Sequence, residues 1–183
     1  MDIRQLTENV TNVLATLTVV ADVLVVVGLI LIFVPVARRC AVSQKVVTFV
    51  KSRATEIVGG LALIAMFGSL YFSDVAGYNP CKLCWYQRIL MYPIVILAIT
   101  GLVKKSREVL DYIFPLAALG APLALYHYLM QRGVVAASDC AVVGYSESCS
   151  STFFMEYGYI AIPMMALSVF ALQLVVMAIE KKK

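Results

Sequence analysis

The stretch NPCKLCWYQR, residues 79–88, combines residue types that could carry out redox chemistry. Cys81 and Cys84 are separated by two residues, and Arg88 follows Cys84 by four positions. C-x-x-C is a spacing in which the pKa of a cysteine is readily lowered, which favours thiol–disulfide exchange. As a static disulfide it would stabilise the fold little, because closing so short a loop constrains few unfolded conformations. We therefore interpret this pair as a reactive dithiol.

The residues around the pair predict that it lies at the start of a helix. Asn79 is a favourable N-cap and Pro80 suits the first helical position, which would put both cysteines near the positive end of the helix. Cys84 and Arg88 would then share one helix face. A guanidinium there would stabilise a thiolate at Cys84 or an anionic oxygen of a bound ligand. The alternative is an arginine that only reaches out to the membrane interface.

A second pair, Cys140 and Cys149, follows in a segment rich in serine. Such a composition is typical of a mobile loop. A disulfide there, beside a fixed dithiol, indicates a relay, because exchange needs a thiolate in line with a disulfide sulfur. Two alternatives stay open, namely a pair of static loop disulfides and a metal site that uses the C-x-x-C as half of its ligands. The single histidine and the wider second spacing disfavour the metal site, and we expect no bound metal.

The composition indicates where this dithiol must work. The 183-residue chain is 62% hydrophobic and 14% charged, with a mean hydropathy of +0.89, whereas soluble domains are roughly half apolar. We therefore expect an all-α, polytopic membrane helix bundle embedded in a lipid bilayer, since backbone groups cannot stay unpaired in lipid. The net charge of +4 does not indicate a nucleic-acid partner, because the basic residues gather at the ends of apolar segments.

Five apolar stretches are long enough to cross a hydrocarbon core, for which about 20 residues are needed. They cover approximately residues 13–37, 57–72, 85–103, 109–130 and 157–179. The first is too long for the apolar part of a signal peptide, and we expect a retained helix. Residues 42–53 mix apolar and basic side chains, which fits either a helix along the membrane interface or a plain polar linker.

The distribution of lysine and arginine predicts the orientation. Eleven of the 15 basic residues lie between the first and second stretches, between the third and fourth, and after the fifth. The positive-inside rule makes that side cytoplasmic and puts the N-terminus and both cysteine pairs outside. The paired cysteines then lie in an oxidising compartment and Cys40 in a reducing one.

Beyond these motifs, the run CKLCWYQRILMYP is followed by a basic turn, a helix, the second cysteine pair and a last helix containing YGYIAIPMMAL. With this arrangement, about residues 55–180 resemble the disulfide bond formation protein B family (DsbB, called BdbC in some bacteria). The C-x-x-C-x-x-x-R motif at a helix start, with a second pair downstream, is quite specific.

The resemblance implies a four-helix bundle in the bacterial cytoplasmic (inner) membrane. It would reoxidise a DsbA-like thioredoxin-fold protein and pass the electrons to the membrane quinone pool, with ubiquinone or menaquinone as the acceptor. The DsbA–DsbB–quinone system is known to keep the bacterial periplasm oxidised. The resemblance thus implies a protein-disulfide:quinone oxidoreductase that supports protein disulfide bond formation.

The resemblance also implies roles for individual residues. Cys81 and Cys84 correspond to the quinone-facing pair, with Cys84 engaging the quinone ring, and Arg88 corresponds to the arginine of the quinone site. Cys140 corresponds to the cysteine that forms the mixed disulfide with the partner, and Cys149 corresponds to its mate.

Three further side chains each have two interpretations. His127 lies where some family members carry a histidine near the quinone, and otherwise it is an interfacial histidine with no special task. Trp85 belongs by position to the interfacial aromatic belt, and its flat ring could also contact the quinone. Asp22 lies in the first apolar stretch, where an acid invites a functional interpretation. It could equally pair within the bundle, and we assign it no chemistry.

The chain departs from the family pattern in its first apolar stretch and in its second cysteine pair. The first stretch is additional to the four helices. We therefore divide the chain into an extra N-terminal transmembrane helix with a cytoplasmic linker, residues 1–54, and a DsbB-like redox domain, residues 55–183. Eight residues separate Cys140 from Cys149, as in short-loop members. The alternatives to the quinone-linked oxidase are a membrane metal-binding or carrier protein and a structural bundle with two static disulfides.

Overall fold

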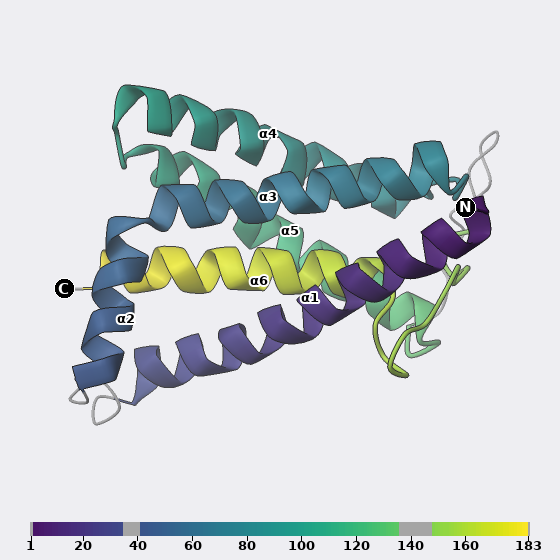
Figure 1. Ribbon diagram of the computed structural model, residues 1–183, viewed down its shortest axis with the longest axis horizontal. Coiled ribbons are helices and arrows are strands. Elements are labelled where there is room, and N and C mark those ends of the chain that lie inside the picture. Colours follow the sequence, from purple (N-terminus) through teal and green to yellow (C-terminus); the bar gives the residue numbers. More distant parts are fainter. Residues whose placement is uncertain (1, 35–40, 136–147, 183) are drawn as a thin grey trace.

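The structure is a computed structural model of the chain, and it describes residues 2–34, 41–135 and 148–182. Its main elements are α1 (Ile3–Phe33), α2 (Ala41–Ser52), α3 (Ala54–Leu70), the π-helical turn η2 (Tyr71–Val75), α4 (Lys82–Lys104), α5 (Val109–Gln131) and α6 (Ile162–Lys181) (Figure 1). Among the described residues, extended pairing is limited to a single bridge between Glu156 and Ile160. The all-α prediction is confirmed.

Five helices are long and apolar enough to cross a membrane, namely α1, α3 continued by η2, α4, α5 and α6. The prediction of five spans is confirmed, although two boundaries differ. Helix α1 begins ten residues early, because Asp2 caps it by accepting from the N–H of Arg4. Helix α6 begins five residues late, because a turn precedes it and Pro163 lies in its first turn. Residues 42–53 proved mostly helical, as α2, and none of its side chains is buried.

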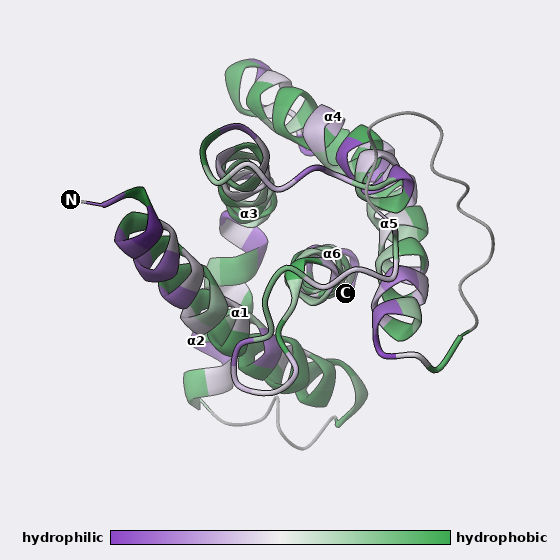
Figure 2. Ribbon diagram, turned by 90° about the vertical axis from the view of Figure 1, so that its right-hand side faces the viewer, coloured by the Kyte–Doolittle hydropathy of each residue, from purple (hydrophilic) through white to green (hydrophobic). Residues whose placement is uncertain are grey.

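Helix α6 lies in the middle of the bundle, with α1, α3, α4 and α5 around it (Figure 2). Half of its apolar window is buried, against 22–33% for the other four spans. Glycines allow two of these helices to approach it closely. A Cβ at Gly120 of α5 would overlap the ring of Phe170, and one at Gly28 of α1 would overlap Val175. Small residues at such contacts are typical of helices that pack within membranes.

The helices alternate in direction, so the bundle has two distinct ends (Figure 1). The starts of α1, α4 and α6 lie at one end, which we call the dithiol end because Cys81 and Cys84 are there. Helix α2, the end of α4 and the C-terminal residues lie at the other end, which we call the lysine end. An ion pair of 2.6 Å between Lys181 and Asp111 joins α6 to α5 there.

Candidate functional site

Cys81 is itself the N-cap of α4. Its Sγ accepts a hydrogen bond from the backbone N–H of Cys84 at 3.4 Å. The prediction that Asn79 caps the helix and Pro80 opens it is therefore wrong. Cys81, two residues after Asn79, is the cap instead, because its sulfur accepts the N–H of Cys84 in the first turn. The helix therefore begins at Lys82. The expected consequence still holds, because both sulfurs lie at the positive end of α4.

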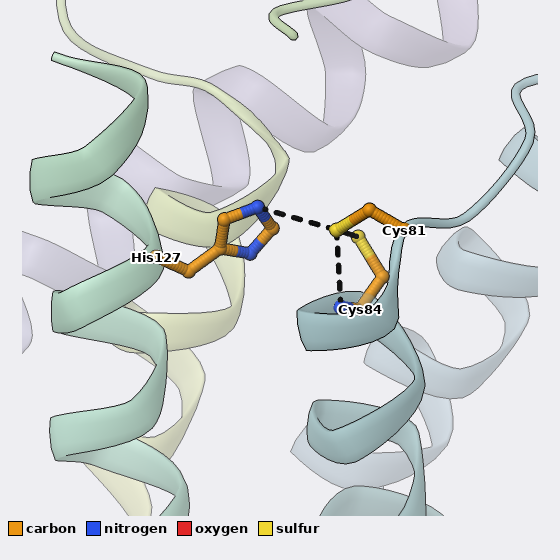
Figure 3. A group of neighbouring side chains, drawn as sticks. All are labelled: Cys81, Cys84 and His127. Carbon is orange, nitrogen blue, oxygen red and sulfur yellow. Dashed lines mark hydrogen bonds between the residues drawn. The ribbon is translucent and has the colours of Figure 1, made fainter. Parts of the chain in front are cut away.

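The two sulfurs of the C-x-x-C lie close enough for a bond to form between them by small side-chain rotations. They are 3.3 Å apart, and the thiol of Cys81 donates to the sulfur of Cys84 (Figure 3). A disulfide holds its sulfurs about 2.05 Å apart. Cys81 is only 4% exposed and Cys84 is half-buried. The pair is thus a shielded dithiol that could be oxidised in place.

His127 of α5, the helix packed beside α4, completes this cluster. Its Nε2 lies 3.5 Å from the sulfur of Cys81, and the ring is 1% exposed (Figure 3). Its Nδ1 lies 2.9 Å from the side-chain nitrogen of Gln87, which is also buried. Because that amide nitrogen is a donor, Nδ1 is the acceptor and the ring proton is on Nε2, facing Cys81. Sequence reasoning missed Gln87, although its position three residues after Cys84 puts it on a neighbouring face of the same helix.

The surroundings of Cys81 determine which sulfur of the pair keeps its proton. The hydrogen bond to Cys84 and burial together raise the pKa of the Cys81 thiol from 9.0 to about 12, although the hydrogen bond with His127 acts in the opposite direction. Cys81 is therefore a thiol at neutral pH and Cys84 is the sulfur that accepts its hydrogen bond. Such an asymmetry favours Cys84 as the more nucleophilic sulfur of the pair.

Cys149 from the second pair packs beside this dithiol. It is 1% exposed and belongs to one buried cluster with Cys81, Leu83 and Met130, and Cys84 packs against the same cluster. The tertiary structure therefore brings one sulfur of the second pair to the first pair, as a relay requires. Cys140 lies outside the described residues.

Arg88 lies one turn below Cys84 and is held by α3. Its Nε donates to the hydroxyl of Ser69 and its Nη2 to the backbone carbonyl of Ser69, both at 2.9 Å. Its guanidinium also lies 5.3 Å from the ring centre of Trp85, which is within cation–π range. Among the described residues, Nη1 has no hydrogen-bond partner. Arg88 is thus held in place by Ser69, and its Nη1 could still donate a hydrogen bond to a ligand.

A cavity of about 310 Å³ begins at this arginine and runs between α1, α3, α4 and α6. Cys84, Gln87, Arg88 and Ser69 contribute polar groups to its lining, and most of the remaining lining is aliphatic or aromatic. A largely apolar cavity with a few convergent polar groups is the usual form of a small-molecule site, and the volume lies at the lower end of the range of such sites, roughly 300–1,000 Å³.

Tyr92 adds an unusual feature to the cavity lining. Its hydroxyl is buried and has no hydrogen-bond partner among the described residues. Buried polar groups in proteins are nearly always paired, so each exception needs an explanation. Cys84, Arg88 and Tyr92 are spaced by four residues and form one face of α4. That spacing could have revealed Tyr92 in the sequence, but we did not predict it.

The other expected site residues lie around this cavity without lining it. Trp85 is 51% exposed and stacks on Arg88, and His127 contacts Cys81 on the far side of the dithiol. Asp22 pairs within the bundle, which was one of its two interpretations. Its carboxylate accepts from the hydroxyl of Ser168 at 2.5 Å and from that of Tyr159 at 3.1 Å.

The same cluster could also hold a metal ion. One ligand atom each from Cys81, Cys84 and His127 lie within 4.8 Å of one another. Two thiolates and an imidazole are a ligand set that suits zinc. The geometry therefore keeps the metal-binding alternative open.

A shielded dithiol that caps a membrane-spanning helix, with a third cysteine in the same buried cluster, is the arrangement expected of a membrane-embedded thiol oxidoreductase. Comparison with known proteins agrees with this class. The family model described as Disulfide bond formation protein DsbB matches residues 51–179. No solved structure matches the chain.

Individual relatives give the same result. Disulfide bond formation protein C of Bacillus subtilis (strain 168) is 42% identical over 123 residues, which cover 66% of this chain and 87% of that protein. Probable disulfide formation protein C 1 of Bacillus anthracis is 40% identical over 108 residues, covering 59% and 77%. The SPbeta prophage-derived disulfide bond formation protein B of Bacillus subtilis (strain 168) is 35% identical over 112 residues, covering 61% and 74%.

The chain belongs to the DsbB family of disulfide bond formation proteins, because the family model matches well over half of it. It is accordingly a multi-pass membrane thiol oxidoreductase with a role in disulfide bond formation. The expected family is confirmed.

Proposed function

We propose that this protein reoxidises a DsbA-like thioredoxin-fold protein and passes the electrons through its two cysteine pairs to a membrane quinone. The observation that carries the proposal is the position of Cys84. Its sulfur lies within reach of Cys81, it packs against the cluster that contains Cys149, and it also lines the cavity that Arg88 enters. Cys84 therefore stands between the disulfide relay and a site for a small apolar acceptor.

The cavity fits a quinone by two tests of its own residues. The lining is mostly apolar, as a prenylated ring requires, and donors are available for the ring oxygens at Nη1 of Arg88 and at the hydroxyl of Tyr92. An orphaned hydroxyl that a ligand would satisfy explains why the group is tolerated in an apolar site. Trp85 and His127 remain predicted quinone contacts, and their positions support indirect roles, on Arg88 and on Cys81.

The proposed exchange begins outside the cytoplasm. A thiolate of the partner attacks the Cys140–Cys149 disulfide at Cys140, forming a mixed disulfide and releasing Cys149. The partner's second thiol then closes the partner's own disulfide and releases Cys140. Two electrons have now passed from the partner to the second pair, and the partner is oxidised.

The second pair then reduces the first. Cys149 attacks the Cys81–Cys84 disulfide at Cys81, a member of the same buried cluster, and Cys84 leaves. Cys140 next displaces Cys81 from Cys149, which restores the second disulfide and leaves Cys81 and Cys84 reduced. His127 donates its Nε2 proton toward the sulfur of Cys81 and so eases the departure of that sulfur in the last exchange.

A quinone supplies the final acceptor, since its reduction takes up two electrons and two protons. The two thiols of Cys81 and Cys84 provide both when they close to a disulfide. Cys84 is the cysteine of the pair that lines the cavity, and the guanidinium of Arg88 would stabilise negative charge on an oxygen of a bound ring.

We also propose the location and the division of the chain. The lysine end faces the cytoplasm of a bacterial cell across its inner membrane, and the dithiol end with the N-terminus faces outward. Residues 55–183 form the redox domain, and residues 1–54 form an added helix with its linker. The family match to residues 51–179 supports this division.

The test is quinone reduction by the purified protein in lipid nanodiscs with a reduced thioredoxin-fold substrate. We expect turnover by the wild type and by Cys40→Ser, which changes a cysteine outside both pairs, and none by Cys84→Ser. A wild type that reduces neither ubiquinone nor menaquinone, although the substrate is competent with another oxidant, refutes the proposal.

The metal cluster supports a second candidate, a membrane metal-binding protein. It predicts one zinc ion per reduced protein, held by Cys81, Cys84 and His127, and no quinone turnover. Metal analysis of the reduced wild type and of His127→Ala separates the two functions. Stoichiometric zinc that is lost in the variant, without any quinone reduction, would favour the metal-binding function.

A further inference from the structure

Helix α1 lies outside the family match and yet forms part of the cavity. The match begins at residue 51, whereas α1 ends at Phe33. Six of the cavity-lining residues come from α1: Leu14, Leu17, Thr18, Val20, Ala21 and Leu24. If α1 were absent, the lining residues of α3 and α6 that face α1 would have no described part of the chain across the cavity from them. The site is therefore built partly from a segment that the matched family region does not include.

Helix α1 packs mainly against α6. Toward the dithiol end, Asp22 accepts hydrogen bonds from Ser168 of α6 and from Tyr159 just before it. Toward the lysine end, Gly28 packs directly against Val175. These contacts hold α1 against α6 along the half of α1 that is nearer the lysine end. They therefore also set the distance between α1 and α3.

On the α3 side, contacts between α1 and the α3–η2 segment occur near the dithiol end. The hydroxyls of Thr7 and Tyr71 lie 3.3 Å apart, and a Cβ at Gly68 would lie 3.2 Å from a methyl group of Leu14. Beyond these contacts α1 and α3 diverge toward the lysine end, as Figure 1 shows. The part of the cavity that is lined by residues of both α1 and α3 is called the cleft below.

The mouth of this cleft is apolar and open at the surface of the bundle. Leu17, Val20 and Leu24 of α1 and Ile64 of α3 line the cavity and are still 48–51% exposed. They belong to two helices that are long and apolar enough to cross a membrane, where the neighbouring solvent is lipid tails. The cavity thus has a polar inner end at Arg88 and a lateral opening toward the hydrocarbon core.

We propose that α1 is a wall of the quinone site, and that the cleft between α1 and α3 holds the prenyl tail while the ring lies at Cys84 and Arg88. This inference rests on the proposed quinone function and adds a determinant of ligand choice to it. A prenyl chain is apolar, flexible and already dissolved in the bilayer, so it fits an aliphatic cleft that opens sideways into lipid. A water-soluble acceptor would have no use for such an opening.

Two substitutions on α1 test whether this helix lines the quinone site, because α1 has one valine in the cavity lining and another of similar exposure outside it. Val20 lines the cleft and is 51% exposed, whereas Val23 is 56% exposed and does not line it. Val20→Trp should fill the mouth and Val23→Trp should only add bulk toward lipid. Quinone reduction is measured in nanodiscs with a long-tailed quinone and with the same ring lacking a tail, with the thiol substrate held saturating.

We expect Val20→Trp to raise the KM for the long-tailed quinone at least about tenfold and the KM for the tailless ring by less than about twofold, with Val23→Trp close to wild type for both. Identical constants for the two variants with both quinones would overturn the proposal. A wild type without any quinone reduction would instead refute the proposed function, so the two failures are distinguishable.

A second measurement on the unchanged protein keeps the test valid if Val20→Trp does not fold. A quinone with a photoreactive group on its tail is irradiated in the nanodiscs, and the labelled peptides are identified by mass spectrometry. Label on residues 14–24, reduced by an excess of unmodified long-tailed quinone, supports the cleft. Label confined to α3, α4, α5 or α6, or label on α1 that the competitor does not reduce, overturns it.

Discussion

Arg88 and Asp22 both lie within membrane-spanning helices, and their surroundings differ. Arg88 of α4 is anchored by Ser69 but keeps one nitrogen without a partner among the described residues. Asp22 of α1 has both carboxylate oxygens occupied, by Tyr159 and Ser168. Charge inside a membrane is costly and needs a reason. The guanidinium of Arg88 keeps an N–H donor that a ligand in the cavity could use. The carboxylate of Asp22 has all of its hydrogen bonds within the bundle and so stabilises the packing of α1 on α6.

The neighbours of the two charges differ in the same way. Around Arg88, the hydroxyl of Tyr92 has no hydrogen-bond partner among the described residues, and the thiol of Cys81 donates to the sulfur of Cys84. These groups are available for a ligand or for redox chemistry. Around Asp22, the partners are hydroxyls that donate to it, and none of the atoms left unpaired in the described chain belongs to Asp22, Tyr159 or Ser168. The predictions that follow test this contrast, from the largest expected effect to the smallest.

The largest effect should appear in the reactivity of the dithiol. Because the pKa of Cys81 is raised to about 12, alkylation of the reduced protein by iodoacetamide at pH 8 should modify Cys84 at least about a hundredfold faster than Cys81. The rate at Cys81 should rise about tenfold per pH unit until the pH approaches this pKa. Peptide mapping by mass spectrometry measures both rates, and equal rates at pH 8 would contradict the assignment of the proton.

The same pKa shift predicts how stability depends on pH. The folded state holds the proton of Cys81 more tightly than the unfolded chain does, so the contribution to stability is complete below the ordinary pKa of 9.0 and is lost as the pH rises toward about 12. Thermal unfolding of the reduced protein should therefore show a decline over this range that is smaller in Cys81→Ser.

The second effect concerns the affinity for quinone. Arg88→Ala should raise the KM for quinone about 10- to 100-fold, the size expected for losing a hydrogen bond from a charged group. At saturating quinone, oxidation of the thiol partner should be weakened much less. Lys82→Ala removes an exposed cation of the same helix and is the control. If Arg88→Ala and the wild type show equal kinetics at all quinone concentrations, Arg88 does not serve the quinone.

A smaller effect should follow from Tyr92→Phe. The KM for quinone should rise about three- to tenfold, because one neutral hydrogen bond is lost. The melting temperature without quinone should stay the same or rise, since the hydroxyl has no partner in the described chain to lose. Tyr86→Phe changes an exposed tyrosine of the same helix and is the control. A fall in stability without a change in KM would assign the hydroxyl to the fold.

The smallest effect on turnover should come from Asp22. Asp22→Leu should lower the stability by about 1 kcal/mol, as for other hydrogen bonds between membrane helices, and leave the KM for a tailless quinone within about twofold. Asp22→Asn keeps an accepting oxygen and should lie close to the wild type in a thermal unfolding assay. If both variants lose turnover while remaining folded, the carboxyl takes part in the chemistry and the contrast with Arg88 does not hold.

Local features of this site could be predicted, whereas contacts across the bundle could not. Helical periodicity alone puts Cys84 and Arg88 on one face, and hydropathy alone defines the five spans. The cap of α4 was predicted wrongly, because Asn79 is the better cap by preference whereas the sulfur of Cys81 is the atom placed to accept the N–H of Cys84. Gln87 was missed because its role depends on a histidine of another helix.

The sequence by itself determined the family, the membrane-spanning helices and the dithiol with an arginine one turn away. These depend on composition and on spacing along a single helix, which the chain encodes directly. Only the tertiary structure decided that His127 contacts Cys81, that Cys149 joins the same buried cluster, that Ser69 holds Arg88, and that α1 lines the cavity. Those contacts join residues of different helices, and they depend on which faces pack and how closely, which hydropathy and spacing do not specify.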